Sequence, residues 1–356
     1  MKLNYNKIYQ GNCVEVLKSF SDESVDLVFA DPPYNLQLKN NLSRPNNTLV
    51  NGVFDEWDKF SSFKEYDDFS EAWIYECKRV LKPNGSIWII GSYHNIFRIG
   101  KIIQDLGLWI LNDIIWRKTN PMPNFRGMRY TNAHETLIWA SKTQKSKYTF
   151  NYKAMKSING DLQMRSDWLL PICNGKERIK KDDKKVHSTQ KPESLLSRVI
   201  LSNSNVNDVV LDPFFGSGTT GAVAKKLRRR WIGIEQYEGY IFEANKRIDN
   251  TSILNKDDLE ILKSNREEPR IPFGQLIERG LVSPGEVLFD GRKRWYAKVR
   301  ADGSIISNDS KGSIHFVGAN VQGLSACNGW TFWHVKRKGS FISINNLRDE
   351  LRKELA

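Results

Sequence analysis

The sequence predicts an α/β fold in which a doubly wound, mostly parallel sheet is followed by a small β-rich C-terminal domain. Three observations lead to this prediction. Short, continuous apolar runs alternate with helical stretches along most of the chain, and two of these runs end in turns rich in proline or glycine. The pattern then changes at residues 266–272, a charged segment with two prolines that is typical of a linker.

The first domain is predicted over residues 1–265. Its strands are continuous apolar runs at residues 25–30, 86–90, 110–116, 135–140, 209–212 and 230–234. Its helices are predicted at residues 69–80, 93–106, 192–202 and 221–227. Strands without polar alternation are buried on both faces, so the helices are expected to cover both sides of a mainly parallel sheet.

The second domain is predicted over residues 272–356. Short strand-like runs broken by glycine turns occur at residues 286–289, 295–299, 304–306, 313–317 and 330–335, and a final helix is predicted at 347–355. The total length of 356 residues is sufficient for two domains with separate cores.

Composition narrows the class of protein. No run approaches the ~20 apolar residues of a membrane span, and the four scattered cysteines predict neither a disulfide framework nor a metal site. We therefore expect a reduced, cytoplasmic protein without a metal. The net charge is +13, and residues 142–185 alone hold twelve basic and five acidic residues. Such a field suits a polyanion, although a solvated lysine-rich surface would look the same.

A nucleotide-like cofactor is predicted at the turn that follows residues 209–212. Gly216 and Gly218 permit close backbone approach, and the following helix presents its N–H groups to a ligand. Glu235, 19 residues beyond Gly216, ends the next strand, where its carboxylate can accept ribose hydroxyls. The third glycine of a dinucleotide turn is absent, which disfavours a dehydrogenase. A tight turn without a ligand is the alternative.

Asp31-Pro32-Pro33-Tyr34, at the end of another strand, suits a methyl transfer to an amino group. The prolines fix the backbone and leave carbonyl oxygens as acceptors. If Asp31 and the Pro32 carbonyl accept both hydrogens of an exocyclic amino group, its lone pair becomes free to attack a sulfonium methyl group. Tyr34 offers a stacking face for an extruded base. A rigid loop without chemistry is the alternative, and the neighbouring cofactor turn makes it weaker.

Together these residues resemble the amino-methyltransferases of the permuted β class. Asp31-Pro32-Pro33-Tyr34 matches their catalytic motif, and the later run from Asp212 to Gly218 matches their cofactor motif. Further runs resemble the cell-cycle-regulated (CcrM-like) DNA adenine-N6 methyltransferases that modify GANTC: residues 29–38, 91–98, 120–125, 132–140 and 327–331. The resemblance covers essentially the whole chain, including the C-terminal domain.

The resemblance implies a seven-stranded methyltransferase sheet, S-adenosylmethionine as cofactor, double-stranded DNA as substrate, and a homodimer. It also implies transfer to adenine N6 by base flipping and direct in-line attack, in a bacterial cytoplasm, at the nucleoid and in connection with DNA replication. The residues that match cofactor-binding positions are Asn12, Cys13, Asp31, Gln190, Lys191, Pro192, Asp212, Phe214, Gly216, Ser217, Gly218, Thr219, Thr220 and Glu235. Asn12 stands where the family usually has Asp, and Ser188 where it has Pro.

DNA contacts are predicted in two places. Arg44, Asn124, Arg126 and Arg129 lie in polar loops after the strands of the pocket, where they can meet bases, phosphates or a dimer partner. The loop at residues 38–52 can insert a wedge beside a flipped base. In the C-terminal domain, Ser313, Asn328 and Trp330 match family runs and are expected to meet DNA. The alternative for Trp330 is a place in the core.

Several rival functions remain open from the sequence alone. Cytosine-N4 methylation uses the same amino-group chemistry, although those enzymes more often carry Ser before Pro-Pro-Tyr. Methylation of RNA or of protein glutamine is more distant, because the basic segment and second domain favour DNA. A silent DNA-binding protein would not need the intact Asp31 and Tyr34.

Overall fold

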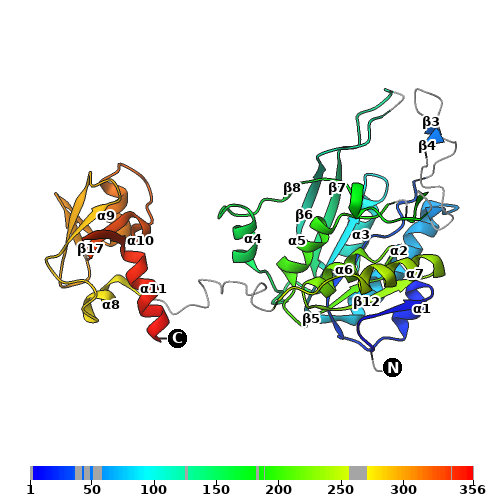
Figure 1. The fold of residues 1–356 in the computed structure, drawn as a ribbon, viewed down its shortest axis with the longest axis horizontal. Coiled ribbons are helices and arrows are strands. Elements are labelled where there is room, and N and C mark those ends of the chain that lie inside the picture. Colours follow the sequence, from blue (N-terminus) through cyan, green and yellow to red (C-terminus); the bar gives the residue numbers. More distant parts are fainter. Residues whose placement is uncertain are drawn as a thin grey trace. The chain divides into compact units, whose positions relative to one another are not determined.

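A computed structural model of the chain describes residues 3–36, 42–43, 49–50, 58–124, 127–181, 184–187, 189–255, 271–337 and 339–355. The chain divides into two compact units, Met1–Leu262 and Lys263–Ala356 (Figure 1). Each unit has its own hydrophobic core. Most of the predicted linker lies outside the described residues.

The first unit is built on one eight-stranded sheet with the order β1-β12-β11-β2-β5-β7-β6-β8. The strands are β1 Lys7–Gln10, β2 Val25–Ala30, β5 Leu81–Gly91, β6 Trp109–Lys118, β7 His134–Ser141, β8 Asp167–Leu170, β11 Val209–Asp212 and β12 Arg230–Glu235. All pairs from β1 to β5 are parallel, whereas β7 runs antiparallel to both of its neighbours. The predicted fold class is confirmed, and β8 adds an edge strand to the expected seven.

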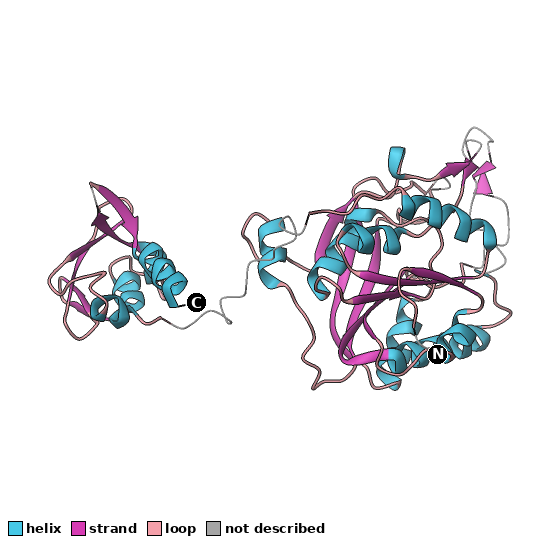
Figure 2. Ribbon diagram, turned by 60° about the horizontal axis from the view of Figure 1, so that its bottom comes forward, coloured by secondary structure: helices cyan, strands magenta, loops and turns pink. Residues whose placement is uncertain are grey.

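Helices cover both faces of this sheet (Figure 2). One face carries α1 Cys13–Lys18, α2 Phe63–Val80 and α3 Ile96–Asp105; the other carries α5 Glu193–Asn203, α6 Thr219–Lys226 and α7 Glu238–Asp249. Along β2, Val28 and Ala30 pack in the first core, whereas Leu27 and Phe29 pack in the second. This double burial explains why the strand is a continuous apolar run.

Smaller elements lie between these. They are the hairpin of β3 Leu42–Ser43 with β4 Leu49–Val50, the helix α4 Tyr152–Ile158, a 3₁₀ turn at Gly175–Glu177, and the pair β9 Lys180–Lys181 with β10 Lys184–Lys185. No helix in the described part of the chain is long and apolar enough to cross a membrane.

The second unit holds a six-stranded antiparallel sheet with the order β16-β15-β14-β13-β17-β18. Its strands are β13 Val287–Asp290, β14 Tyr296–Val299, β15 Ile305–Ser307, β16 Ser310–Gly312, β17 Trp333–Arg337 and β18 Ser340–Ser343. Its helices are α8 Phe273–Glu278, α9 Ile314–Asn320, α10 Gly329–Phe332 and α11 Ile344–Leu355. The predicted β-rich domain with a final helix is thus observed.

One predicted strand of this unit, at residues 313–317, is wrong, and another, at residues 330–335, is predicted to begin three residues too early. Residues 313–317 begin α9, because the Ser313 hydroxyl accepts the Phe316 N–H at 3.2 Å as a helix cap and Ile314 and Val317 share the buried face. Residues 330–332 belong to α10, where the Asn328 side chain accepts the Trp330 N–H at 3.2 Å, and the strand begins only at Trp333.

The connections of the first unit place a switch point between β11 and β2. From β11 the chain passes through α6 to β12 on one side, whereas from β2 it passes through α2 to β5 on the other. Ligands of open α/β sheets bind outside the carboxyl ends of the strands at such a point. Both predicted motifs follow these two strands.

Candidate active site

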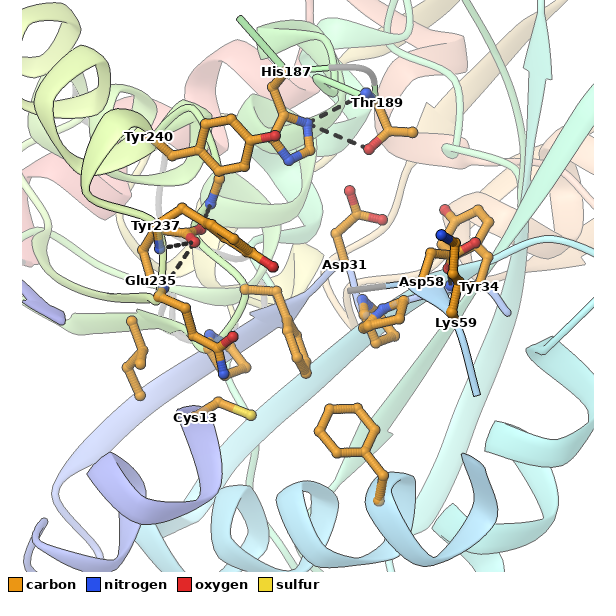
Figure 3. Close-up of a pocket in the computed structure, with 18 of the residues that line it drawn as sticks. Cys13, Asp31, Tyr34, Asp58, Lys59, His187, Thr189, Glu235, Tyr237 and Tyr240 are labelled. Atoms are coloured by element: carbon orange, nitrogen blue, oxygen red, sulfur yellow. Dashed lines mark hydrogen bonds between the residues drawn. The ribbon is translucent and has the colours of Figure 1, made fainter. Parts of the chain in front are cut away.

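A cleft of about 1150 Å³, including its open mouth, lies at this switch point (Figure 3). Its walls come from the turns after four parallel strands: Gly11 after β1, Asp31 to Tyr34 after β2, Phe214 and Gly216 after β11, and Glu235 at the end of β12. Segments that lie far apart in the sequence thus meet because parallel strands end at the same edge.

Asp212 organises the glycine turn at one end of the cleft. Its Oδ1 accepts the Phe214 N–H at 2.9 Å, and its Oδ2 accepts the Thr220 hydroxyl at 2.5 Å. Burial raises the pKa of Asp212 to about 7. Gly218 has φ +74°, and a Cβ there would lie 2.8 Å from the Ala244 Cβ, so the turn accepts only glycine at this position.

Glu235 joins the glycine turn to the next strand. One carboxylate oxygen accepts the Gly216 N–H at 2.8 Å, and the other accepts the N–H groups of Gln236 and Tyr237 at 2.8 and 3.0 Å. Burial raises the pKa of this carboxyl. Glu235 lines the cleft beside Tyr237 (Figure 3), and its remaining lone pairs can accept hydroxyl donors.

The other predicted cofactor residues divide into two groups. Cys13, Asp31, Phe214 and Gly216 line the main cleft; Gln190, Lys191, Asp212, Ser217, Thr219 and Thr220 line a small adjoining pocket. Some side chains have structural partners instead. The Asn12 oxygen accepts the Val14 N–H at 2.9 Å as the cap of α1, and Pro192 is the N-cap residue of α5. The Gln190 side-chain amide accepts the Ile179 N–H and donates to the Glu177 carbonyl.

The tetrapeptide Asp31–Tyr34 and the two residues after it are held by hydrogen bonds from neighbouring segments. The Tyr66 hydroxyl donates to the Pro33 carbonyl at 2.9 Å, so this carbonyl faces the core. The Asp58 carboxylate accepts three successive backbone N–H groups, from Tyr34, Asn35 and Leu36, at 2.6, 2.8 and 2.9 Å. Asn35 takes a left-handed φ of +54°, which the bonds to Asp58 stabilise.

Asp31 and Lys191, both predicted as site residues, belong to a set of buried charges whose other members, Glu135 and Lys118, the sequence analysis did not identify. Asp31 Oδ2 accepts from the Lys191 ammonium at 2.7 Å. Glu135 accepts from the Tyr34 hydroxyl at 2.9 Å, pairs with Lys118 at 2.7 Å, and lies 3.9 Å from Lys191. Burial raises the pKa of Asp31 even though the Lys191 charge acts in the opposite direction. Burial would also raise the pKa of Glu135, but Lys191 and Lys118 together hold it below its ordinary value.

Among the predicted DNA residues of the first unit, Asn124 and Arg129 do not line this cleft. Arg44 and Arg126 lie outside the described residues. Arg129 is exposed and donates to the Tyr93 hydroxyl at 2.7 Å, and the half-buried Asn124 accepts the Gly127 N–H through its carbonyl. In the second unit, Ser313 and Asn328 are helix caps, and Trp330 is 8% exposed in the core, as the alternative interpretation of this residue expected.

The walls of the cleft fit S-adenosylmethionine by their chemistry. Asp31 supplies negative charge for a positively charged cofactor, Glu235 offers acceptors for ribose, and the rings of Phe214 and Tyr237 can flank an adenine. No group of three or more His, Cys, Asp or Glu side chains with the geometry of a metal site occurs among the described residues.

The comparisons with known proteins agree with this geometry. Residues 25–246 match the family of DNA methylases, and residues 255–356 match the family described as Restriction Enzyme Adenine Methylase Associated. The chain is 52% identical to the Type II methyltransferase M.HinfI of Haemophilus influenzae over 97% of this chain and 96% of that protein. It is 43% identical to the Type II methyltransferase M2.MboI of Moraxella bovis over 68% of this chain and 87% of that protein.

Solved structures share the fold of the first unit. The M1.HpyAVI–SAM complex has a TM-score of 0.52 at 30% identity and covers 68% of this chain and 98% of its own. The cytosine-N4-specific PvuII DNA methyltransferase has a TM-score of 0.53 at 24% identity, over 71% of this chain and 89% of its own, which shows the fold alone. The chain therefore belongs to the DNA methylase family and is a DNA methyltransferase that uses S-adenosylmethionine.

Proposed function

We propose that this enzyme methylates adenine N6 in double-stranded DNA, within GANTC, after the adenine has been flipped out of the duplex. The observation that carries the proposal is the position of the Asp31 carboxylate beside the Tyr34 ring, in a cleft continuous with the glycine turn. The match of residues 255–356 to an adenine-methylase-associated family supports adenine as the base. The choice of GANTC rests on the resemblance described above.

Asp31 would act on the amino group of the base. Lys191 occupies one side of Oδ2, and a carboxylate has about four acceptor positions, so Asp31 can still accept an N6 hydrogen. With the Pro32 carbonyl accepting the other hydrogen, the nitrogen lone pair is withdrawn from the ring. The cofactor supplies a methyl group on positive sulfur: the lone pair forms the N–C bond while the S–C electron pair stays on sulfur. The nitrogen then loses one proton to Asp31, and the N–H bonding pair returns to nitrogen.

Tyr34 would hold the base against the carboxylate. The hydrogen bond from its hydroxyl to Glu135 fixes the ring, and the three N–H groups bound by Asp58 fix its backbone. A fixed ring loses little entropy when a flipped base stacks on it. Positioning of this kind matters because a displacement of about 1 Å can cost about a hundredfold in rate.

The second unit would engage DNA. Basic and aromatic side chains lie together on it: the Arg294 guanidinium is 4.1 Å from the Trp295 ring, and the Lys293 ammonium is 4.3 Å from the Phe341 ring. Such pairs suit phosphate contact and base stacking. Ser313 and Asn328 remain candidates for DNA contacts. On the basis of the family resemblance, we also propose that the enzyme forms a homodimer, is located at the nucleoid and acts in connection with DNA replication.

The decisive experiment is identification of the product. DNA is methylated by the purified enzyme, digested to nucleosides and analysed by mass spectrometry for N6-methyladenine and N4-methylcytosine. Duplexes with GANTC and with GANTT are compared, because one wrong base pair typically costs ~1–3 kcal/mol. N4-methylcytosine would refute the adenine assignment. N6-methyladenine in both duplexes at equal rates would refute only the site specificity.

A further inference from the structure

Four charged side chains form a buried cluster that meets the cleft at Asp31: Asp31, Lys191, Glu135 and Lys118. Their exposed side-chain fractions lie between 8% and 16%. They come from four separate places, namely the turn after β2, the segment before α5, strand β7 and strand β6. Two carboxylates and two ammonium groups make the cluster neutral, which is the condition for keeping charges away from water at a tolerable energy.

The distances give each member of the cluster a different task. Lys191 is close to Asp31 at 2.7 Å and farther from Glu135 at 3.9 Å. Glu135 uses one oxygen for Lys118 and the other for the Tyr34 hydroxyl. Lys191 therefore sets the orientation of the Asp31 carboxylate, and Glu135 sets that of the Tyr34 ring.

We propose that Lys191 is a positioning residue that keeps Asp31 aimed and charged as an acceptor, and that Glu135 limits this effect by sharing the Lys191 charge. The inference rests on the proposed role of Asp31 toward an amino group. A protonated Asp31 would present a donor where the amino hydrogens need an acceptor. The charge balance of the cluster thus determines the fraction of enzyme that is competent for transfer.

Other titratable and charged groups lie near the cluster, some of them acidic and some basic. Asp212 adjoins Asp31 from the end of β11, with Glu235 beyond it, whereas Arg178 and His187 lie on the side of Lys191. Burial and then the Lys191 charge lower the pKa of His187 to about 4, so His187 stays neutral near pH 7. The variants below leave these four groups unchanged.

The test compares K191M, K191R, E135Q and the double variant K191M/E135Q with the wild-type enzyme. Single-turnover methyl transfer is measured across pH with saturating DNA and cofactor, and cofactor affinity is measured by calorimetry. K191M makes the cluster net negative, so the acid limb of the rate profile should move to higher pH and the rate near pH 7 should fall about 10- to 100-fold, as for other outer partners of reactive groups. K191R keeps the charge and should keep the position of the limb.

E135Q makes the cluster net positive, and its amide oxygen can still accept from Tyr34. Its acid limb should therefore move to lower pH. The double variant restores neutrality, so its limb should lie between those of the single variants. Equal limbs in all variants, or shifts of the same sign in K191M and E135Q, would overturn the proposal. If K191M does not fold, the downward shift in E135Q alone decides. These outcomes hold for either methylated base, so mass spectrometry of the product separates a failure here from a failure of the adenine assignment.

Discussion

Replacing Asp31 by asparagine tests the chemistry with the smallest change of shape. The amide has one acceptor oxygen and one NH2 group, whereas the carboxylate accepts on both sides. If the oxygen stays 2.7 Å from the Lys191 ammonium, the NH2 group faces the amino group of the base, and two donors meet. If the amide turns over, the NH2 group faces the ammonium. Neither orientation serves both partners, so the variant should bind DNA but transfer poorly.

The expected loss of rate follows from the hydrogen bond between the carboxylate and the amino group that the substitution removes. Loss of one charge-directed contact in a transition state costs about 2.7–4 kcal/mol, or roughly 10²–10³ in rate. Cofactor affinity should change by less than about tenfold, because the glycine turn and Glu235 are unaltered. Stability should fall by less than the ~3–5 kcal/mol typical of a broken buried pair, because Glu135 lies 3.9 Å from Lys191 and can take up its charge.

Single-turnover transfer of a radiolabelled methyl group, together with calorimetry of cofactor binding, provides the measurement. A matched control is Asp26→Asn, at the other end of the same strand. Asp26 also pairs with a lysine, Lys82, at 2.8 Å and accepts the Val209 N–H at 2.9 Å. This control should lose stability while keeping the transfer rate. Retention of more than a few per cent of the wild-type rate in Asp31→Asn would contradict the role given to the carboxylate.

Three further predictions concern the cofactor turn and the second unit. Gly218→Ala should lower the free energy of unfolding by about 1–3 kcal/mol in urea titrations and weaken cofactor binding, because its Cβ would lie 2.8 Å from that of Ala244. Because burial raises the pKa of Asp212 from 3.8 to about 7, the folded chain binds more protons than the unfolded chain between these values. Wild-type stability should therefore fall relative to Asp212→Asn as the pH rises through this range, and the difference in melting temperature should level off above it. A chain ending at Ser264 should bind the cofactor normally but lose DNA affinity in salt-dependent anisotropy titrations; unchanged affinity and salt slope would exclude a DNA-binding role for the second unit.

The fold of the first unit could be predicted because a strand that is buried on both faces has a recognisable sequence pattern, a continuous run of apolar residues. Val28 and Phe29 point to opposite cores, so the strand shows no polar alternation and its environment can be read from six residues. The edge strand β8 has a weaker sequence pattern. It has only four residues, and Leu169 is 56% exposed.

The second unit shows where local patterns are ambiguous. Residues 313–317 contain three apolar residues in five, which suits a strand or one turn of helix equally well. The hydroxyl of Ser313 decides in favour of the helix by capping it, and Gly329 packs against the Ile314 carbonyl so closely that a Cβ would lie 2.3 Å from it. The contact between Gly329 and Ile314 joins two separate segments of the chain, and it produces no periodic pattern in the sequence of either segment.

The same distinction explains why the site was predicted only in part. Asp31, Glu235 and the glycine turn could be recognised because strand ends of a parallel sheet gather at one edge. The partners that make Asp31 useful are separated from it by 160 residues in the case of Lys191, and Glu135 is 101 residues from the Tyr34 hydroxyl that it accepts. Nothing in the spacing of those residues predicts such contacts, since each depends on a different strand or turn.

A carboxylate that must accept hydrogens from a neutral amino group faces two opposing requirements. It must be shielded from water, because water would otherwise compete for its hydrogen bonds. Shielding also raises the pKa of the carboxyl, however, and the protonated form presents a donor where the amino hydrogens need an acceptor. A single buried lysine would keep the carboxylate charged, but a strong ion pair with it would also compete with the amino group of the base for the carboxylate oxygens. The second carboxylate, Glu135, draws on the same ammonium from 3.9 Å and is itself balanced by Lys118 at 2.7 Å. The directions of the strands make this arrangement possible, because β6 ends and the antiparallel β7 begins at the same edge of the sheet at which β2 ends. The chemistry of the tetrapeptide therefore depends on the topology of the sheet as much as on its own four residues.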